Sequence, residues 1–348
     1  MLLATIVALS FFSALNMYGI AGAQSSFFIK HVIFIVAGIG IMMLFSFFNY
    51  RFLKNNSLPV FIVYIISVLL LIVPFFFQAI RGVRSWITVG GFTFEPAELA
   101  KLALIVLMAK YFSQRHIHIH QFRHIFVSGI YFIIPLIIIL VQPDLGSSVI
   151  FVCIWLGILL SAGINKKHIF ALIILAVLAG YGGWLFVLKP YQKERVVSFI
   201  NPYADPRGAG YNLIQSKIAI GSGHWLGAGL GQGSQVKLGF LPEPHNDFVF
   251  ASAAEQFGLL GIAFVLTSVL VIISRILLIG ERAMSNFGKL FCIGMAILIF
   301  AHAFIGAGVN IGIMPVTGLP FPFLSYGGSH FLSLMIGLGI VQSIRRYR

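Results

Sequence analysis

The residues best suited to chemistry lie in one short run, Phe240 to Phe250, which contains Glu243, His245 and Asp247. A carboxylate beside a second acid and partly withdrawn from water tends towards a raised pKa, which suits a group that accepts and returns a proton. Asp247 is therefore the leading candidate for a general base. Two other roles stay open from the residues alone: a helix N-cap for Asp247, and a divalent-ion site formed by all three side chains.

A second group of charged residues surrounds the start of an apolar run near residue 97. Within it, Glu98 and Lys101 are three residues apart, so on a helix they lie on one face and can neutralise each other. Both a structural ion pair and a direct catalytic role fit this spacing. Arg81 and Arg84, a few residues earlier, have the charge and geometry to neutralise a phosphate or pyrophosphate.

The longest polar stretch, about residues 188–246, contains seven glycines between Gly221 and Gly239. Glycines at this density allow backbone N–H groups to approach an anion closely, as in anion-binding loops. The spacing matches neither the P-loop nor the Rossmann fingerprint, so a flexible or re-entrant loop is an equal alternative.

Three further polar residues have simpler explanations than catalysis. Asp144, between Pro143 and Gly146, is either an Asx cap of the turn that joins two apolar runs or a member of the site. His302 and Asn310 lie inside an apolar run, where hydrogen bonds to neighbouring helices are expected rather than reaction.

Membrane helices must position these residues, because hydrophobic residues make up 59% of the chain and charged residues only 9%. Such a composition excludes an ordinary soluble domain. The net charge of +14 is divided into small groups between apolar runs. That distribution is typical of membrane topology determinants and argues against nucleic-acid binding.

Ten apolar runs are long enough to cross about 30 Å of hydrocarbon. They cover approximately residues 2–20, 30–49, 58–79, 97–113, 125–142, 147–163, 168–187, 247–274, 288–311 and 328–344. Basic residues concentrate in alternate connections, which the positive-inside rule assigns to the cytoplasm together with both termini. The prediction is an all-α polytopic membrane protein, a single domain over 1–348 with about ten transmembrane helices. One large extracytoplasmic loop, about 188–246, connects helices 7 and 8.

This topology places most acidic residues on or near the external side of the membrane, so the chemistry is expected there. The last external segment, residues 315–328, contains prolines and glycines that break a helix. Irregular backbone at membrane depth must be buried or line a cavity.

Taken together, the motifs resemble the shape, elongation, division and sporulation (SEDS) family, the RodA/FtsW/SpoVE-type peptidoglycan polymerases, over nearly the whole chain. The Met-Pro-Val-Thr-Gly stretch and the C-terminus favour the RodA-like branch, whereas the Gly-Leu-Gly-Gln stretch near residue 231 resembles the division branch. Asn246 and Gln256 depart from the usual family residues. The matching motifs are Arg81 to Ile87, Phe94 to Lys101, Gln142 to Gly146, Tyr211 with Gln215 and Ser216, Gly221 to Gly223, Leu241 to Phe248, Asn310 to Gly312 and Pro315 to Gly328.

The resemblance implies a peptidoglycan glycosyltransferase that polymerises lipid II into β-1,4 glycan strands for cell elongation, shape or division. Undecaprenyl pyrophosphate is released on the outer face of the bacterial cytoplasmic membrane. The resemblance places Asp247 at the family's essential aspartate, the hypothesised base for the acceptor 4-hydroxyl. Candidates for binding the pyrophosphate are Arg81, Arg84, Lys101, Arg195 and Lys217. Supporting candidates are Glu98, Asp144, Gln215, Ser216, Glu243, His245, Glu255 and Ser325.

The same resemblance sets expectations for cofactors and partners. No tightly bound cofactor is expected, and Mg²⁺ or Mn²⁺ carried by the substrate pyrophosphate is the open alternative for a metal. The expected partners are lipid II, membrane lipids and a class B penicillin-binding protein transpeptidase. Two other functions compete with polymerisation, a lipid II flippase and a non-enzymatic cell-wall scaffold. A flippase predicts inverted repeats and broken helices near the membrane midplane.

Overall fold

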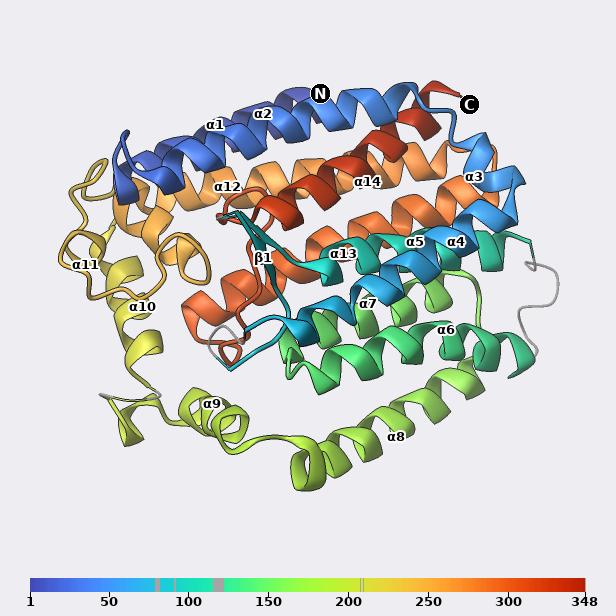
Figure 1. Ribbon diagram of the computed structural model, residues 1–348. Coiled ribbons are helices and arrows are strands. Elements are labelled where there is room, and N and C mark those ends of the chain that lie inside the picture. The colour runs from blue at the N-terminus through green and yellow to red at the C-terminus, as the bar shows by residue number, and fades with distance from the viewer. Residues whose placement is uncertain (79–81, 91, 115–121, 207, 209, 348) are drawn as a thin grey trace. The chain divides into compact units, whose positions relative to one another are not determined.

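The computed structural model describes residues 1–348 except 79–81, 91, 115–121, 207, 209 and 348 (Figure 1). Arg81, a predicted pyrophosphate ligand, therefore lies outside the described residues. Helices occupy each of the apolar runs identified in the sequence. They are α1 (Leu2–Ala21), α2 (Ser26–Phe47), α4 (Ser57–Leu70), α5 (Pro96–Ser113), α6 (Phe122–Val141), α7 (Leu145–Ser161), α8 (Lys166–Gly182), α12 (Val249–Glu281), α13 (Asn286–Ile311) and α14 (Gly328–Arg346).

Within the described parts of the chain, seven helices are long and apolar enough to cross a membrane. The protein is therefore a multi-pass membrane protein. Two of the other helices, α5 and α7, do not meet these requirements of length and apolar composition, each for a different reason. The α7 helix has 17 residues, whereas α5 carries Glu98, Lys101 and Lys110.

The connections contain short elements that hydrophobic periodicity does not reveal. Helical segments lie in the 188–246 stretch and near residues 51, 73 and 183. They are α3 (Arg51–Asn55), η1 (Val73–Phe76), η2 (Gly183–Val187), α9 (Pro190–Ile200), η3 (Pro202–Ala204), α10 (Tyr211–Ser222) and α11 (Ser234–Lys237). The predicted large loop therefore contains several helical segments.

One small sheet departs from the all-α expectation. Strands β1 (Ile87–Val89) and β2 (Phe92–Phe94) pair antiparallel, with Thr88 opposite Thr93. β-branched and aromatic residues favour extended backbone. Gly90, with φ of 59°, supplies the left-handed conformation that the turn requires.

The described chain divides into two compact units, each assembled from three segments. Unit 1 contains Met1–His31, Asn165–Leu270 and His302–Tyr326. Unit 2 contains Val32–Ile164, Val271–Ala301 and Gly327–Arg348.

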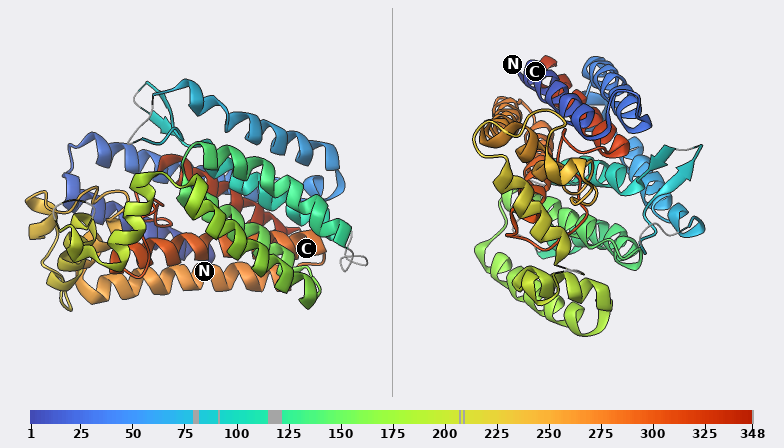
Figure 2. Two further views of the ribbon diagram at one scale, coloured as in Figure 1. Left: turned by 90° about the horizontal axis from the view of Figure 1, so that it is seen from below. Right: turned by 90° about the vertical axis from the view of Figure 1, so that its left-hand side faces the viewer.

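In unit 2, α5 packs against α4, α6, α7 and α14 (Figure 1). The side-by-side packing of α6 and α7 can also be followed from two other directions (Figure 2). Apart from Leu99, every residue of α5 from Pro96 to Phe112 is buried. Protein rather than lipid therefore surrounds the charges of α5, which is the environment that charged residues in membrane proteins require.

In unit 1, α12 is interrupted at Gly258, where φ is 65° and ψ is −163°. The glycine-rich segment around residues 223–229 occupies the break. Its N–H groups reach carbonyls before the break, from Ala228 to Glu255 at 2.8 Å and from Gly229 to Gln256 at 3.1 Å. Beyond the break, the N–H of Leu259 donates to the carbonyl of His224 at 2.9 Å.

The glycines of this segment are explained by that close packing. A Cβ at Gly223 would lie 1.9 Å from the carbonyl oxygen of Ala254, and one at Gly227 would lie 2.1 Å from that of Gln256. The backbone groups that the helix break exposes are thus paired inside the protein, as irregular backbone at membrane depth requires. The segment therefore bridges the two halves of a broken helix. These contacts do not support the prediction that its glycines bind an anion.

Candidate functional site

Three consecutive carbonyl groups of the loop at residues 243–248, called the Asp247 loop, are each held by a hydrogen bond from the segment at 310–326. The bonds run from Tyr326 N to His245 O (2.8 Å), from Ser325 Oγ to Asn246 O (2.8 Å) and from Asn310 Nδ2 to Asp247 O (2.9 Å). All these residues belong to unit 1. Fixing three successive peptide groups fixes the direction in which the Asp247 side chain leaves the backbone.

Asn310 makes a capping contact at the start of α12. The helix begins at Val249, and the N–H of its third residue, Ala251, donates to Asn310 Oδ1 at 3.0 Å. A capping side chain normally serves this N–H from the residue just before the helix. At this N–H group the capping contact comes from a side chain of α13.

Asn310 connects several elements of unit 1. Its side chain is buried, and its Nδ2 also donates to the Gly306 carbonyl at 2.8 Å. Its own carbonyl accepts a hydrogen bond from Ser216 Oγ on α10 at 2.8 Å. The prediction that Asn310 bonds to neighbouring elements is confirmed, and Ser216 supports the Asp247 loop through it. The neighbouring Gln215 is half-buried on the same helix.

Replacing Asn310 by Ala should lower the stability of unit 1, because the buried N–H of Ala251 and the carbonyl of Asp247 both lose their partner. Leaving buried polar groups unsatisfied costs about 1–3 kcal/mol each. The measurement is thermal unfolding of the purified protein in detergent. Ser216→Ala, which removes only the bond to the Asn310 carbonyl, is the matched control and should have a smaller effect. Equal melting temperatures for the two variants would contradict the role given to Asn310.

Gly318 borders the Asp247 carboxyl group. Its φ is 74°, and a Cβ built on it would lie 3.9 Å from Asp247 Oδ2. The same segment receives one predicted cation, because Arg195 Nη1 donates to the carbonyl of Val316 at 3.4 Å. The structure therefore brings Arg195 to the segment that flanks Asp247. The sequence did not identify Gly318 as a site residue. Its only signal was its place among the prolines and glycines of residues 315–328.

Glu243 shapes the Asp247 loop from within. Its φ is 45°, uncommon for a residue with a side chain. Its Oε2 atom accepts a hydrogen bond from Asn246 Nδ2 at 3.2 Å and lies 3.4 Å from His245 Nε2. The His245 ring packs on Phe27, with 4.8 Å between the ring centroids. Carboxylate oxygens are ligands that Mg²⁺ and Mn²⁺ accept, so the chemistry of the loop fits a divalent ion carried by a substrate phosphate.

Glu255 and Lys217 lie elsewhere in unit 1. Glu255 is buried, and its two carboxylate oxygens accept the N–H groups of Gln235 and Val236 at 2.7 and 3.1 Å. It thereby anchors the start of α11. Lys217 lies against Gly312, since a Cβ there would be 2.8 Å from Lys217 Nζ.

A second cluster, in unit 2, contains the predicted ion pair. Lys101 Nζ donates to Glu98 Oε1 at 2.8 Å, and the side chains are 0% and 2% exposed. The other carboxylate oxygen, Glu98 Oε2, lies 2.9 Å from His330 Nδ1 on α14. Ser333 Oγ donates to the Glu98 carbonyl at 2.8 Å. The ion pair is confirmed, and His330, which follows a Gly-Gly-Ser sequence, was not identified from the sequence.

Asp144 caps α7, because its Oδ1 accepts the N–H of Ser147 at 3.0 Å. This confirms the Asx-cap interpretation of the turn. Ser147 Oγ also donates to Glu95 Oε1 at 3.5 Å, which links the cap to the start of α5. Arg84 is exposed, on the segment that leads into β1.

The pKa of Glu95 is raised from 4.5 to about 8, first by burial and then by the negative charges of Glu98 and Asp144, while Lys101 acts in the opposite direction. The folded protein therefore holds this proton more tightly than the unfolded chain does. Glu95 therefore contributes stability that is fully present below pH 4.5 and is lost as the pH rises through about 8. The measurement is the melting temperature across this interval, compared between the protein and its Glu95→Gln variant. The variant should show a smaller decline; an identical decline would place the titrating group elsewhere.

Comparison with known proteins supplies an independent line of evidence. A family model described as cell cycle protein, FTSW_RODA_SPOVE, matches residues 1–348. The peptidoglycan glycosyltransferase MrdB of Escherichia coli K12 is 35% identical over 348 residues, which is 100% of this chain and 93% of that protein. Stage V sporulation protein E of Bacillus subtilis strain 168 is 34% identical over 350 residues, covering 100% and 95% of the two chains.

Solved structures match over similar lengths. One chain, from work on the structural coordination of polymerization and crosslinking by a peptidoglycan synthase complex, has a TM-score of 0.84 and 29% identity. The alignment covers 99% of this chain and 97% of that chain. The rod shape determining protein RodA of Thermus thermophilus has a TM-score of 0.74 at 24% identity, covering 100% and 96%. At this identity, the second match supports the fold alone.

Proposed function

The chain belongs to the FtsW/RodA/SpoVE family of cell cycle proteins and is a peptidoglycan glycosyltransferase, and on that premise we propose that it polymerises lipid II with Asp247 as general base. The observation that carries this assignment is the fixation of the Asp247 loop. Three successive carbonyls are bonded to one segment of unit 1, and the capping contact of α12 comes from Asn310. These bonds to the backbone orient the residue that carries the carboxyl group.

In the proposed reaction, Asp247 accepts the proton of the acceptor sugar's 4-hydroxyl group as that oxygen attacks the anomeric carbon of the donor. The new bond joins this carbon to the acceptor oxygen. The bond that breaks joins the same carbon to the pyrophosphate oxygen, so undecaprenyl pyrophosphate leaves with the bonding electron pair. A general base at this position contributes typically 10²–10⁴-fold to such a step.

The leaving pyrophosphate needs positive charge around it. Among the predicted cations, Arg195 has the strongest support, because it contacts the segment that flanks Asp247. Lys217, Arg81 and Arg84 remain proposed contributors, whereas the charge of Lys101 is compensated by Glu98. Mg²⁺ or Mn²⁺ bound through the substrate phosphates would add further charge neutralisation, and Glu243 and His245 are the residues of the loop that would contact it.

The proposal includes the topology and the partner. We assign about ten transmembrane helices, both termini in the cytoplasm, and an active site on the extracytoplasmic face of the bacterial cytoplasmic membrane. The positive-inside distribution supports this orientation. A structurally similar chain occurs in a peptidoglycan synthase complex, which supports a class B penicillin-binding protein as the transpeptidase partner. The RodA-like motifs favour a role in elongation and shape.

The test is a reconstituted assay with purified protein and lipid II. Polymerisation should give glycan strands together with undecaprenyl pyrophosphate, in detergent and without a membrane gradient. Movement of lipid II across intact vesicles without polymer would instead support the flippase. The absence of both activities, in a sample that retains its thermal unfolding transition, would favour the scaffold.

A further inference from the structure

A cavity of about 770 Å³ lies among α4, α5 and α6 in unit 2. It is remote in sequence from the Asp247 loop and has no part in the proposed reaction. Its size is that of a site for a drug-sized organic molecule. One part of its lining is basic and the other part is apolar and aromatic. Each part suits a different half of one ligand.

One part of the lining is positively charged. Lys110 in the last turn of α5, Arg123 in the first turn of α6 and the neighbouring His124 all line it, and none of the described lining residues is acidic. Helices α4 and α6 also begin at this cavity, and a helix N-terminus carries a partial positive charge. A basic side chain such as Arg123 at a helix N-terminus has the unfavourable sign for that position. Lys110 has the favourable sign for the C-terminus of α5 and its Nζ also donates to the carbonyl of Lys54. An anion in the cavity would therefore compensate chiefly Arg123 and the N-termini of α4 and α6.

The other part of the lining is apolar and aromatic. The ring of Tyr131 lies 6.4 Å from that of Phe61 and 6.0 Å from that of Tyr111. Tyr111 joins this wall to the basic part, because its hydroxyl oxygen lies 3.1 Å from His124 Nδ1. Phe61 and Leu58, which line the cavity, are 43% and 70% exposed. In a multi-pass membrane protein, such side chains are in a position to contact acyl chains.

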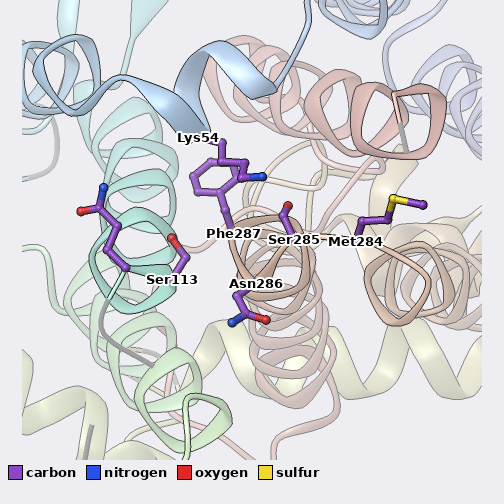
Figure 3. Close-up of a pocket in the computed structure, with 7 residues that line it drawn as sticks. Lys54, Ser113, Met284, Ser285, Asn286 and Phe287 are labelled. Atoms are coloured by element: carbon purple, nitrogen blue, oxygen red, sulfur yellow. The ribbon is translucent and has the colours of Figure 1, made fainter. Parts of the chain in front are cut away.

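A nearby cavity offers a useful contrast. Its volume is about 260 Å³, and it lies where Lys54 and Ser113 approach the segment from Met284 to Phe287 (Figure 3). It shares Gln114 with the larger cavity. The smaller cavity has room for a small anion and solvent, whereas the larger one has an apolar part that a free anion would not use.

We propose that the 770 Å³ cavity binds an anionic membrane phospholipid, with the phosphate head group at Arg123 and Lys110 and an acyl chain along the Phe61 and Tyr131 wall. Basic pockets between membrane helices on the cytoplasmic side are suited to such head groups. Bound lipid would hold α4, α5 and α6 together at the cavity.

The test uses the full-length protein, freed of native lipid by detergent exchange and titrated with short-chain phosphatidylglycerol. Phosphatidylglycerol should raise the melting temperature at lower concentration than short-chain phosphatidylcholine, and inorganic phosphate should not reproduce its effect. Arg123→Ala should increase the half-maximal lipid concentration roughly fivefold, the effect of losing one basic contact. Arg123→Gln, which keeps more of the side-chain length, provides the same comparison if the alanine variant is unstable.

Arg345→Ala is the matched control, because Arg345 is an exposed basic residue of unit 2 that does not line the cavity. It should behave like the unmodified protein. Equal weakening by the two Arg→Ala variants would reduce the effect to general charge attraction and overturn the site. Equal effects of phosphatidylcholine and phosphatidylglycerol, or of inorganic phosphate and phosphatidylglycerol, would overturn the assignment to an anionic lipid.

Discussion

Replacing Asp247 by asparagine should reduce the rate of glycan polymerisation by about 10²–10⁴-fold, because the amide cannot accept the proton of the acceptor hydroxyl. The fold should survive, since Asn310 holds this part of the loop through the backbone carbonyl of Asp247. The measurement is the initial rate of polymer formation from lipid II, together with the melting temperature. Asp247→Glu, which keeps a carboxyl group but displaces it, should retain more activity than the asparagine variant.

The matched control is Glu194→Gln, which removes the same charge from an exposed position of α9 in unit 1. It should polymerise at nearly the unmodified rate. Polymer formation by Asp247→Asn at that rate would rule out the general-base assignment. A loss of polymer accompanied by a large fall in melting temperature would instead make Asp247 a structural residue.

Replacing Lys101 by methionine should destabilise the protein by about 3–5 kcal/mol, because Glu98 would keep a buried charge without its lysine. The expected readout is a large fall in melting temperature. His330 and Ser333 would still contact Glu98. The fall in stability therefore reports the contribution of Lys101 and not that of the whole cluster.

The double variant Glu98→Gln, Lys101→Met tests this explanation. It removes both charges while the glutamine can still bond to His330, so it should recover much of the stability lost in Lys101→Met. If the double variant is less stable than the single variant by the full cost of a second independent substitution, the two side chains do not act as a pair. Glycan polymerisation by a stable double variant would separate a structural role of the pair from a catalytic one.

Several features could be predicted from the sequence because their causes are local or compositional. The multi-pass class follows from the length of apolar runs, since a helix must satisfy its own backbone groups to cross hydrocarbon. The Glu98 and Lys101 pair follows from helical spacing, and the Asp144 cap follows from the residues of a single turn. The family and its activity were accessible because motifs spread along the whole chain keep their order.

Tertiary structure alone decided what surrounds the functional residues. Asn310 reaches the start of α12 from 59 residues away in sequence, and His330 reaches Glu98 from 232 residues away. The glycine-rich segment, interpreted as an anion-binding or flexible loop, instead joins the two halves of α12 at Gly258. The spacing of residues along the chain predicts which face of a helix a side chain occupies. Which distant group forms a hydrogen bond with that side chain depends on how the helices pack. For that reason the sequence was sufficient to nominate Asp247, whereas the hydrogen bonds that orient its loop emerge only when the chain is folded.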